Sequence, residues 1–129
     1  MLNFALSQDQ EKLKKAARDF ALKEVLPLAW YYDQMDAIPV EVLKKAHKAG
    51  IMNADIPKKY GGQELGLIES AIITEEIAAA CPGLATSIFD NSLGMEPLIL
   101  SDKENIKEKY LSEVVKNSKL ICFATSEPL

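Results

Sequence analysis

The amino-acid sequence predicts an all-α fold, an orthogonal or up-down bundle of about five to six helices that ends in the first strand of a missing β-domain. Apolar residues recur every three or four positions in successive segments, which is the spacing of a half-buried helix. Glycines and prolines separate these segments, as they do at helix boundaries. The last apolar run, 120–124, has a strand-like composition and leaves no room for a helix before Pro128. Because a lone strand cannot pair its backbone groups, we expect a domain junction there.

Length and composition indicate one ordinary globular domain of 129 residues, with 48% hydrophobic and 26% charged side chains. The formal net charge of −4 argues against a nucleic-acid binder, which normally presents a basic face. No apolar run approaches the roughly 20 residues that span a membrane, and the N-terminus lacks the features of a secretory signal. Two isolated cysteines and one histidine predict neither disulfides nor a metal site, and they fit a reducing cytoplasm.

The first helix is predicted to begin after Ser7, because Ser7 and Gln10 form a capping box in which each side chain bonds the other residue's backbone N–H. Apolar residues then recur at helical spacing: Leu13, Ala16, Ala17, Phe20 and Ala21. Pro27 lacks an N–H and must bend or end this helix. The aromatic cluster 30–32 that follows is expected at the rim of the core.

A second helix is predicted to begin at Pro39 and to end near Gly50. Its inward-facing residues would be Val42, Leu43 and Ala46. His47 lies among lysines without a positioned partner, so we expect a surface residue rather than a catalytic base.

The third helix is predicted over 67–80. Its inward set would be Ile68, Ala71, Ile72 and Ala79. Glu75 and Glu76 are adjacent, and neighbours on a helix point about 100° apart. We therefore expect one carboxylate to pair with a cation and the other to be solvated, rather than a pair that does acid–base chemistry.

The stretch 82–100 is the centre of the predicted bundle, since its first half is apolar on nearly every side. Gly94 is expected to end or bend this helix, and Pro97 would remove a hydrogen bond from a continuation. One stripe at helical spacing is mixed in character: Thr86, Phe89, Asp90 and Leu93. The pattern alone favours a core helix with one satisfied polar residue, and the alternative is the wall of a ligand pocket.

A last helix is predicted to run to about residue 117, and Asp102 is the residue expected to cap its N-terminus. Its inward-facing residues would be Ile106, Tyr110, Leu111 and Val114.

Short motifs along the whole chain resemble the acyl-CoA dehydrogenase family, most closely its short- and medium-chain branch. The segment 121–128, ICFATSEP, is similar to the start of the family's flavin-binding middle domain. Further similarities follow in the family's order: Phe20-Ala21 with 24–27, 50–62, 75–78 and 91–94. The resemblance assigns 1–118 to the N-terminal helical domain and 119–129 to a truncated start of the β-domain.

This resemblance implies part of a three-domain, tetrameric FAD enzyme that oxidises an acyl-CoA thioester to the 2,3-enoyl-CoA and passes electrons to an electron-transferring flavoprotein. It places Phe123, Thr125 and Ser126 along the flavin ring. It also places the mixed stripe, Thr86, Phe89, Asp90 and Leu93, on the acyl pocket, and this favours the pocket interpretation. The Phe89 ring would then close the pocket and favour an acyl group of about four carbons.

Departures from the family pattern limit what this chain does alone. Leu129 stands where the family has glycine, and no carboxylate corresponds to the catalytic glutamate, so no catalytic residue is assigned. We expect an inactive fragment that holds no FAD, lacks a nucleic-acid or membrane partner and self-associates. The alternatives are a standalone helical module that binds acyl groups without redox chemistry, and an interaction domain that partners a separate flavin-carrying chain.

Overall fold

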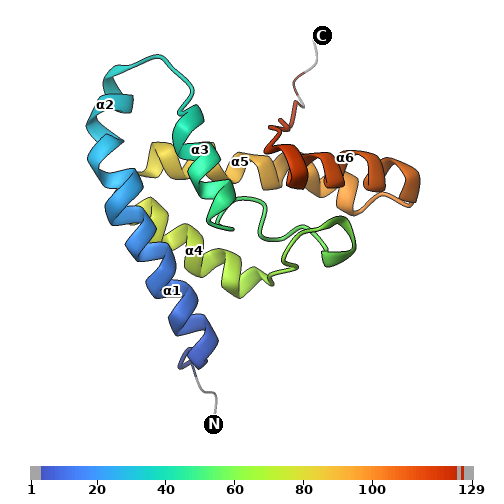
Figure 1. The fold of residues 1–129 in the computed structure, drawn as a ribbon, viewed down its shortest axis with the longest axis horizontal. Helices are drawn as coiled ribbons and strands as arrows, with labels where there is room; N and C mark the ends of the chain where they lie inside the picture. Colours follow the sequence, from blue (N-terminus) through green and yellow to red (C-terminus); the bar gives the residue numbers. More distant parts are fainter. Residues whose placement is uncertain (1–3, 125, 127–129) are drawn as a thin grey trace.

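The computed structural model describes residues 4–124 and Ser126. Within these residues all regular secondary structure is helical, and the helices are connected by turns and coil. Six α-helices follow one another: α1 (Gln8–Phe20), α2 (Ala29–Gln34), α3 (Val40–Lys48), α4 (Leu67–Ala80), α5 (Pro82–Ile99) and α6 (Glu104–Asn117). Helix α1 packs along α4, and α6 lies along the second half of α5 (Figure 1). The predicted all-α fold is confirmed.

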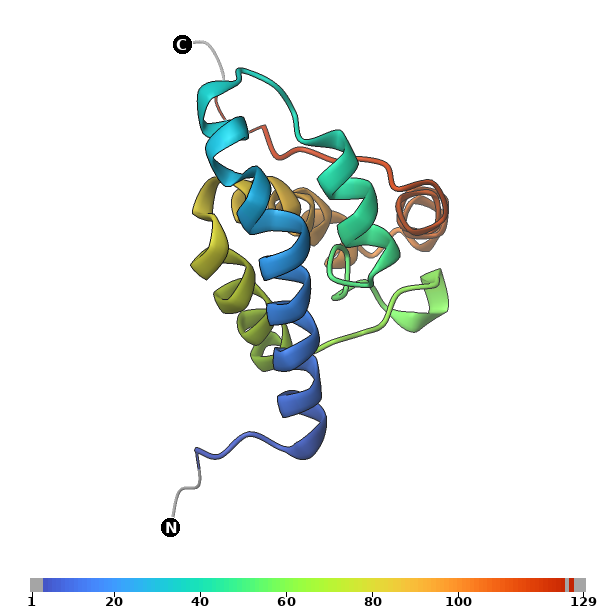
Figure 2. The same cartoon turned by 60° about the vertical axis from the view of Figure 1, so that its left-hand side comes forward.

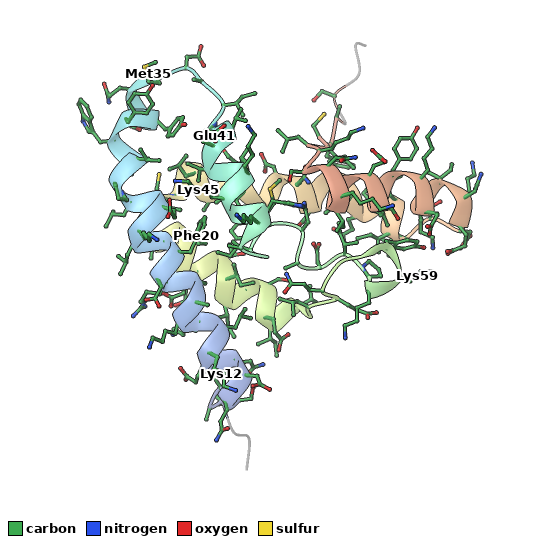
Figure 3. All side chains as sticks on the ribbon, in the orientation of Figure 1. Lys12, Phe20, Met35, Glu41, Lys45 and Lys59 are labelled. Atoms are coloured by element: carbon green, nitrogen blue, oxygen red, sulfur yellow. The ribbon has the colours of Figure 1, made fainter. Side chains whose placement is uncertain are left out.

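The predicted start of α1 is confirmed in detail. The Gln10 N–H donates to Ser7 Oγ at 3.2 Å, and the Ser7 N–H donates to Gln10 Oε1 at 2.9 Å. As expected, regular α-helix stops before Pro27: a π-helical turn (Ala21–Val25) and a 3-10 turn (Leu26–Leu28) separate α1 from α2. Lys45 of α3 points toward this π-helical turn (Figure 3), where its Nζ donates to Glu24 Oε2 at 2.6 Å.

Two buried clusters hold the helices together. The larger lies between α1, α3, α4 and the first half of α5 and includes Val25, Val42, Ala46, Ile77 and Ile88. The smaller lies between the second half of α5, α6 and the loop after α3, and it consists of Ile56, Tyr60, Met95, Leu111 and Val114. Helix α5 contributes to both clusters, so it is the element on which the two halves of the domain are assembled.

The side of α4 that faces the core differs from the prediction. Ile68 is 62% exposed, and Ala71 and Ala79 are also exposed. The buried residues are Ile72, as predicted, and also Ile73, Glu76 and Ile77. Apolar residues occur all around this helix, so its periodicity does not select one side. Packing against α1 selects it, because Arg18 of α1 provides a partner for Glu76.

Two helix boundaries also differ from the prediction. Helix α5 continues through Gly94 and Pro97 to Ile99, so neither residue ends it. Gly94 lies in its interior because another segment of backbone approaches closely there, as described below. Helix α6 begins at Glu104 without a side-chain cap, and Asp102 does not cap it. In α6, Leu111 and Val114 are buried as predicted, Ile106 is half-buried, and Tyr110 is 46% exposed.

The predicted strand is not formed in the described part of the C-terminal segment. Residues 118–124 are coil, because a strand needs a neighbour to accept and donate its backbone hydrogen bonds. Figure 2 shows this segment leaving α6 and running back over α5 toward the end of the domain that carries α2. Helix α6 ends at Asn117 with Ser118 in the left-handed conformation (φ 49°), close to the predicted junction at 118. The assignment of 119–129 to a β-domain stays a prediction.

An ion-pair cluster at the start of α6 makes the stability of the fold depend on pH. Glu104 accepts from Lys59 Nζ at 2.9 Å and from Tyr60 Oη at 2.8 Å, and it also pairs with Lys107. Lys59 reaches it from the loop before α4 (Figure 3). Hydrogen bonds from Lys107, Lys59 and Tyr60, in that order, lower the pKa of Glu104 from 4.5 to about 2.

Because its folded pKa lies below the unfolded value, ionised Glu104 stabilises the fold above pH 4.5, and this contribution disappears as the pH falls toward 2. We expect Glu104→Gln to be less stable than wild type at pH 7 by a small amount, since the carboxylate is exposed. The difference should shrink below pH 4.5 and vanish near pH 2 in urea titrations. Glu108→Gln, on the same helix, is the control. A Glu104→Gln deficit that stays constant from pH 7 to pH 2 would contradict this linkage.

Candidate functional site

A groove of about 490 Å³ lies between α4 and α5 and is lined mainly by apolar side chains. Helix α4 contributes Ile73 and Thr74, and helix α5 contributes Phe89 and Leu93. Leu65, from the loop that precedes α4, is also part of the lining. The volume of the groove falls within the range of about 300–1,000 Å³ that is usual for small-molecule sites.

The four residues of the mixed stripe are not brought together. Phe89, which is half-buried, and Leu93, which is 53% exposed, line this groove. Asp90 instead lines a separate cavity of about 270 Å³, together with Cys122. Thr86 is exposed, and its Oγ1 donates to the Pro82 carbonyl at 3.0 Å. Successive helical residues point about 100° apart, so the stripe is wider than one groove and only its Phe89–Leu93 edge faces the groove.

The three residues expected along a flavin lie in the C-terminal segment. Phe123 is 50% exposed and Ser126 is exposed, whereas Thr125 lies outside the described residues. Neither Phe123 nor Ser126 is part of the lining of the two cavities described above. The described part of this segment therefore offers an exposed aromatic ring and an exposed hydroxyl without an enclosure, and their contact with a flavin stays a prediction.

A buried polar chain, which the sequence interpretation missed, joins α5 to the C-terminal segment. Asn91 is 2% exposed, and its Oδ1 accepts from the Ile121 N–H at 2.6 Å. Its Nδ2 donates to Asn53 Oδ1 at 2.7 Å and to the Lys119 carbonyl at 3.2 Å. Asn53 Nδ2 is 3.3 Å from His47 Nδ1. The available signal was an amide between buried positions of one helix face, since Asn91 lies three residues after Ile88 and four before Met95.

The predicted surface position of His47 is therefore only half right. Its ring is half-buried at the end of α3 and contacts Asn53, which lies in the loop that follows. The local pattern does not indicate this partner, because Asn53 lies six residues after His47 in a loop, where its backbone is left-handed (φ 63°).

The predicted split between Glu75 and Glu76 is confirmed. Glu76 is 4% exposed and receives two hydrogen bonds from Arg18, from Nε at 2.6 Å and from Nη2 at 3.0 Å, whereas Glu75 is exposed. The hydrogen bond and charge of Glu76 raise the pKa of the Arg18 guanidinium. Because Glu76 is held by this pair, it has a structural role and is not available as a base.

The described part of the chain also bears on metal binding and on membrane insertion. No group of three or more histidine, cysteine, aspartate or glutamate side chains there is arranged to hold a metal ion. None of the helices within the described residues has the length and apolar content needed to cross a membrane.

The sequence of this chain is similar to a known protein family and to individual known proteins. A family model described as "Acyl-CoA dehydrogenase, N-terminal domain" matches residues 7–118. The probable medium-chain specific acyl-CoA dehydrogenase 2 of Caenorhabditis briggsae is 32% identical over 127 residues, which are 98% of this chain and 31% of that protein.

Two solved structures share the arrangement of helices. Butyryl-CoA dehydrogenase from Megasphaera elsdenii superimposes with a TM-score of 0.81 at 28% identity, over 92% of this chain and 32% of that one. An acyl-CoA dehydrogenase complexed with FAD from Bacillus anthracis superimposes with a TM-score of 0.80 at 31% identity, over 94% of this chain and 21% of that one. The chain spans about a third of the length of the curated relatives it matches.

Proposed function

The chain belongs to the acyl-CoA dehydrogenase family as an N-terminal domain, and we propose that it forms the helical side of the acyl-CoA site in an FAD-dependent acyl-CoA dehydrogenase. The reaction would be oxidation of an acyl-CoA to the 2,3-enoyl-CoA. The observation that carries the proposal is the apolar groove between α4 and α5, which lies in a domain of this family and is lined by Phe89 and Leu93.

The groove has the chemistry that an acyl chain requires. Phe89 and Leu93 of α5 and Leu67 of α4 provide apolar surface from two helices, and burying each CH₂ of an acyl chain contributes about 0.8 kcal/mol. Thr74, also in the lining, provides a hydroxyl near the groove. Among the four stripe residues, Phe89 and Leu93 are the strongest candidates for contact with substrate; Asp90 and Thr86 would contact it only through surfaces completed by other domains.

The cofactor of the complete enzyme would be FAD, which when bound accepts the hydride from substrate. Phe123 would pack against the flavin ring and the hydroxyl of Ser126 would offer it a hydrogen bond; Thr125, outside the described residues, is proposed beside them. Both described side chains are exposed, so they provide one edge of the site. Binding has to overcome several kcal/mol of lost freedom, and we therefore propose that this chain alone is colourless and catalytically inert.

We expect the groove to bind acyl-CoA weakly and its depth to depend on Phe89. In NMR titrations of this chain with butyryl-CoA and octanoyl-CoA, the shifted resonances should cluster at Phe89, Leu93 and Ile73. Phe89→Ala should raise the affinity for octanoyl-CoA relative to butyryl-CoA, by up to about fourfold for each methylene newly accommodated. The reason is that removing the ring lengthens the apolar surface open to the chain.

Ile68→Ala is the matched control, since Ile68 is an exposed residue of α4 outside the groove lining. It should leave the ratio of the two affinities unchanged. Shifts that map away from the groove, or a ratio that does not rise in Phe89→Ala, would count against the acyl-binding role.

The same preparation separates the alternatives. Flavin that stays with the protein through gel filtration would contradict the proposed inertness. Tight acyl-CoA binding without flavin would favour a standalone acyl-binding module, and co-purification of a flavin-carrying chain would favour an interaction domain. Family membership supports a homo-oligomeric enzyme with an electron-transferring flavoprotein as its redox partner.

A further inference from the structure

Helix α5 carries a binding position for the backbone of the C-terminal segment, formed by Asn91 and Gly94 and called here the α5 seat. The Asn91 amide accepts from the Ile121 N–H at 2.6 Å and donates to the Lys119 carbonyl at 3.2 Å. An amide side chain has both an acceptor and donors. It can therefore satisfy a carbonyl and the N–H two residues later at the same time, which defines one position of the segment along the helix.

Gly94 lies one helical turn after Asn91 and permits the close approach of that segment. A Cβ at position 94 would lie 2.8 Å from Ile121 Cγ2, 2.9 Å from the Ile121 carbonyl oxygen and 3.0 Å from its carbonyl carbon. Two of these three atoms are backbone, so rotation of a side chain does not relieve the contact. Asn91 and Gly94, three residues apart, thus hold the same residue, Ile121, from one face of α5.

The Asn91 side chain is itself held in orientation by a second contact. Its Nδ2 also donates to Asn53 Oδ1 at 2.7 Å, and Asn53 in turn lies against His47. This contact distinguishes the two ends of the Asn91 amide, because Asn53 Oδ1 requires a donor and the Ile121 N–H requires an acceptor. A buried asparagine costs stability unless it is fully bonded, and filling the space alone would be served by an apolar residue.

We propose that Asn91 is a positioning residue, which together with Gly94 holds Ile121 on α5 and so sets where Phe123, one of the proposed flavin-contacting residues, lies relative to the acyl groove. The inference rests on the proposed function. Phe89 and Leu93 of the same helix line the groove, so one rigid element carries the groove wall and the α5 seat. Phe123 follows Ile121 by two residues, about 7 Å of extended chain. A displacement of about 1 Å between reacting groups costs an enzyme up to a hundredfold in rate.

The first test measures hydrogen exchange and fluorine NMR on this chain with 4-fluorophenylalanine at its 4 phenylalanines. Asn91→Leu should accelerate exchange of the Ile121 amide roughly five- to tenfold, as expected for loss of one hydrogen bond. The Phe123 resonance should shift or broaden, while those of Phe89 and Phe20 stay in place. Asn105→Leu is the matched control, because Asn105 is an exposed asparagine in the first turn of α6, and it should leave Ile121 and Phe123 unchanged.

A second variant keeps the test decisive if Asn91→Leu does not fold. Gly94→Ala retains Asn91 but pushes against Ile121, and it should give the same two changes. The proposal is overturned if the wild-type Ile121 amide exchanges at the rate of an unprotected amide. It is also overturned if exchange in the variants accelerates equally at Ile121 and at core amides such as Ile77, which would indicate general destabilisation. Neither readout involves a ligand, so absence of acyl-CoA binding would refute the proposed function without producing either result.

Discussion

Replacing Ile77 by alanine is expected to lower the free energy of unfolding by about 2–5 kcal/mol, a large part of the stability of a domain of this size. Ile77 is 0% exposed on α4 and belongs to the larger buried cluster, in which α4 packs against α1 and α5. Truncation removes buried methylene groups and leaves a cavity that the surrounding helices fill only in part. Urea unfolding monitored by circular dichroism gives the difference directly.

The matched control is Ile68→Ala, the same substitution on the same helix. Ile68 is 62% exposed, so its truncation should change the free energy of unfolding by less than about 0.5 kcal/mol. The pair tests which side of α4 faces the core, because Ile68 was predicted to face inward, whereas Ile77 is the buried residue in the structure. Equal losses in the two variants, or a larger loss in Ile68→Ala, would contradict the packing described above.

Gly62→Ala is expected to be destabilising by about 1–3 kcal/mol or more, because the added methyl group has no room. A Cβ at Gly62 would lie 2.0 Å from the Ile56 carbonyl oxygen, and 2.5 Å from its carbonyl carbon and its Cβ. The same oxygen accepts the Glu64 N–H at 2.9 Å, and Ile56 is 0% exposed in the smaller cluster. This clash can be removed only if the loop backbone shifts and disturbs the packing of Ile56 against α5 and α6. Urea unfolding of the variant measures the loss.

Gly83→Ala makes the complementary comparison. Apart from its chain neighbours and the backbone of its own helix, no atom lies within 4 Å of a Cβ built at Gly83, in the first turn of α5. Alanine there should leave stability unchanged or raise it by about 0.5–1 kcal/mol, since it restricts the unfolded chain and favours the helix. If Gly62→Ala proves as stable as Gly83→Ala, the loop after α3 does not pack as described.

The features that depend on neighbours along the chain were predictable from the sequence. The capping box of Ser7 and Gln10 joins residues three apart, and the interruption at Pro27 follows from a missing N–H. The burial of Leu84, Ala85 and Ile88 followed from the apolar character of the first half of α5. The family was recognisable from short motifs in a fixed order, and the match of the family model to residues 7–118 confirms it.

The candidate site was only partly predictable. Helical spacing indicates which residues lie near one another on a helix, but it does not indicate which other part of the protein they face. Phe89 and Leu93 face the groove because α4 packs beside them, whereas Asp90 faces the C-terminal segment. Nothing in the local pattern shows that the adjacent residues Phe89 and Asp90 face different cavities. The groove exists only after α4 and α5 have packed against each other.

What the sequence determined by itself is the family and the existence of α1, α3, α4, α5 and α6, but not of α2, since capping, periodicity and turn residues act over about four positions along the chain. Tertiary structure decided which side of α4 is buried, which backbone segment packs against Gly94, and which groups Asn91 binds. Asn91 meets Asn53 from 38 positions away and Ile121 from 30 positions away. Such partners are brought together only by the packing of the helices, so no local pattern of residues encodes them.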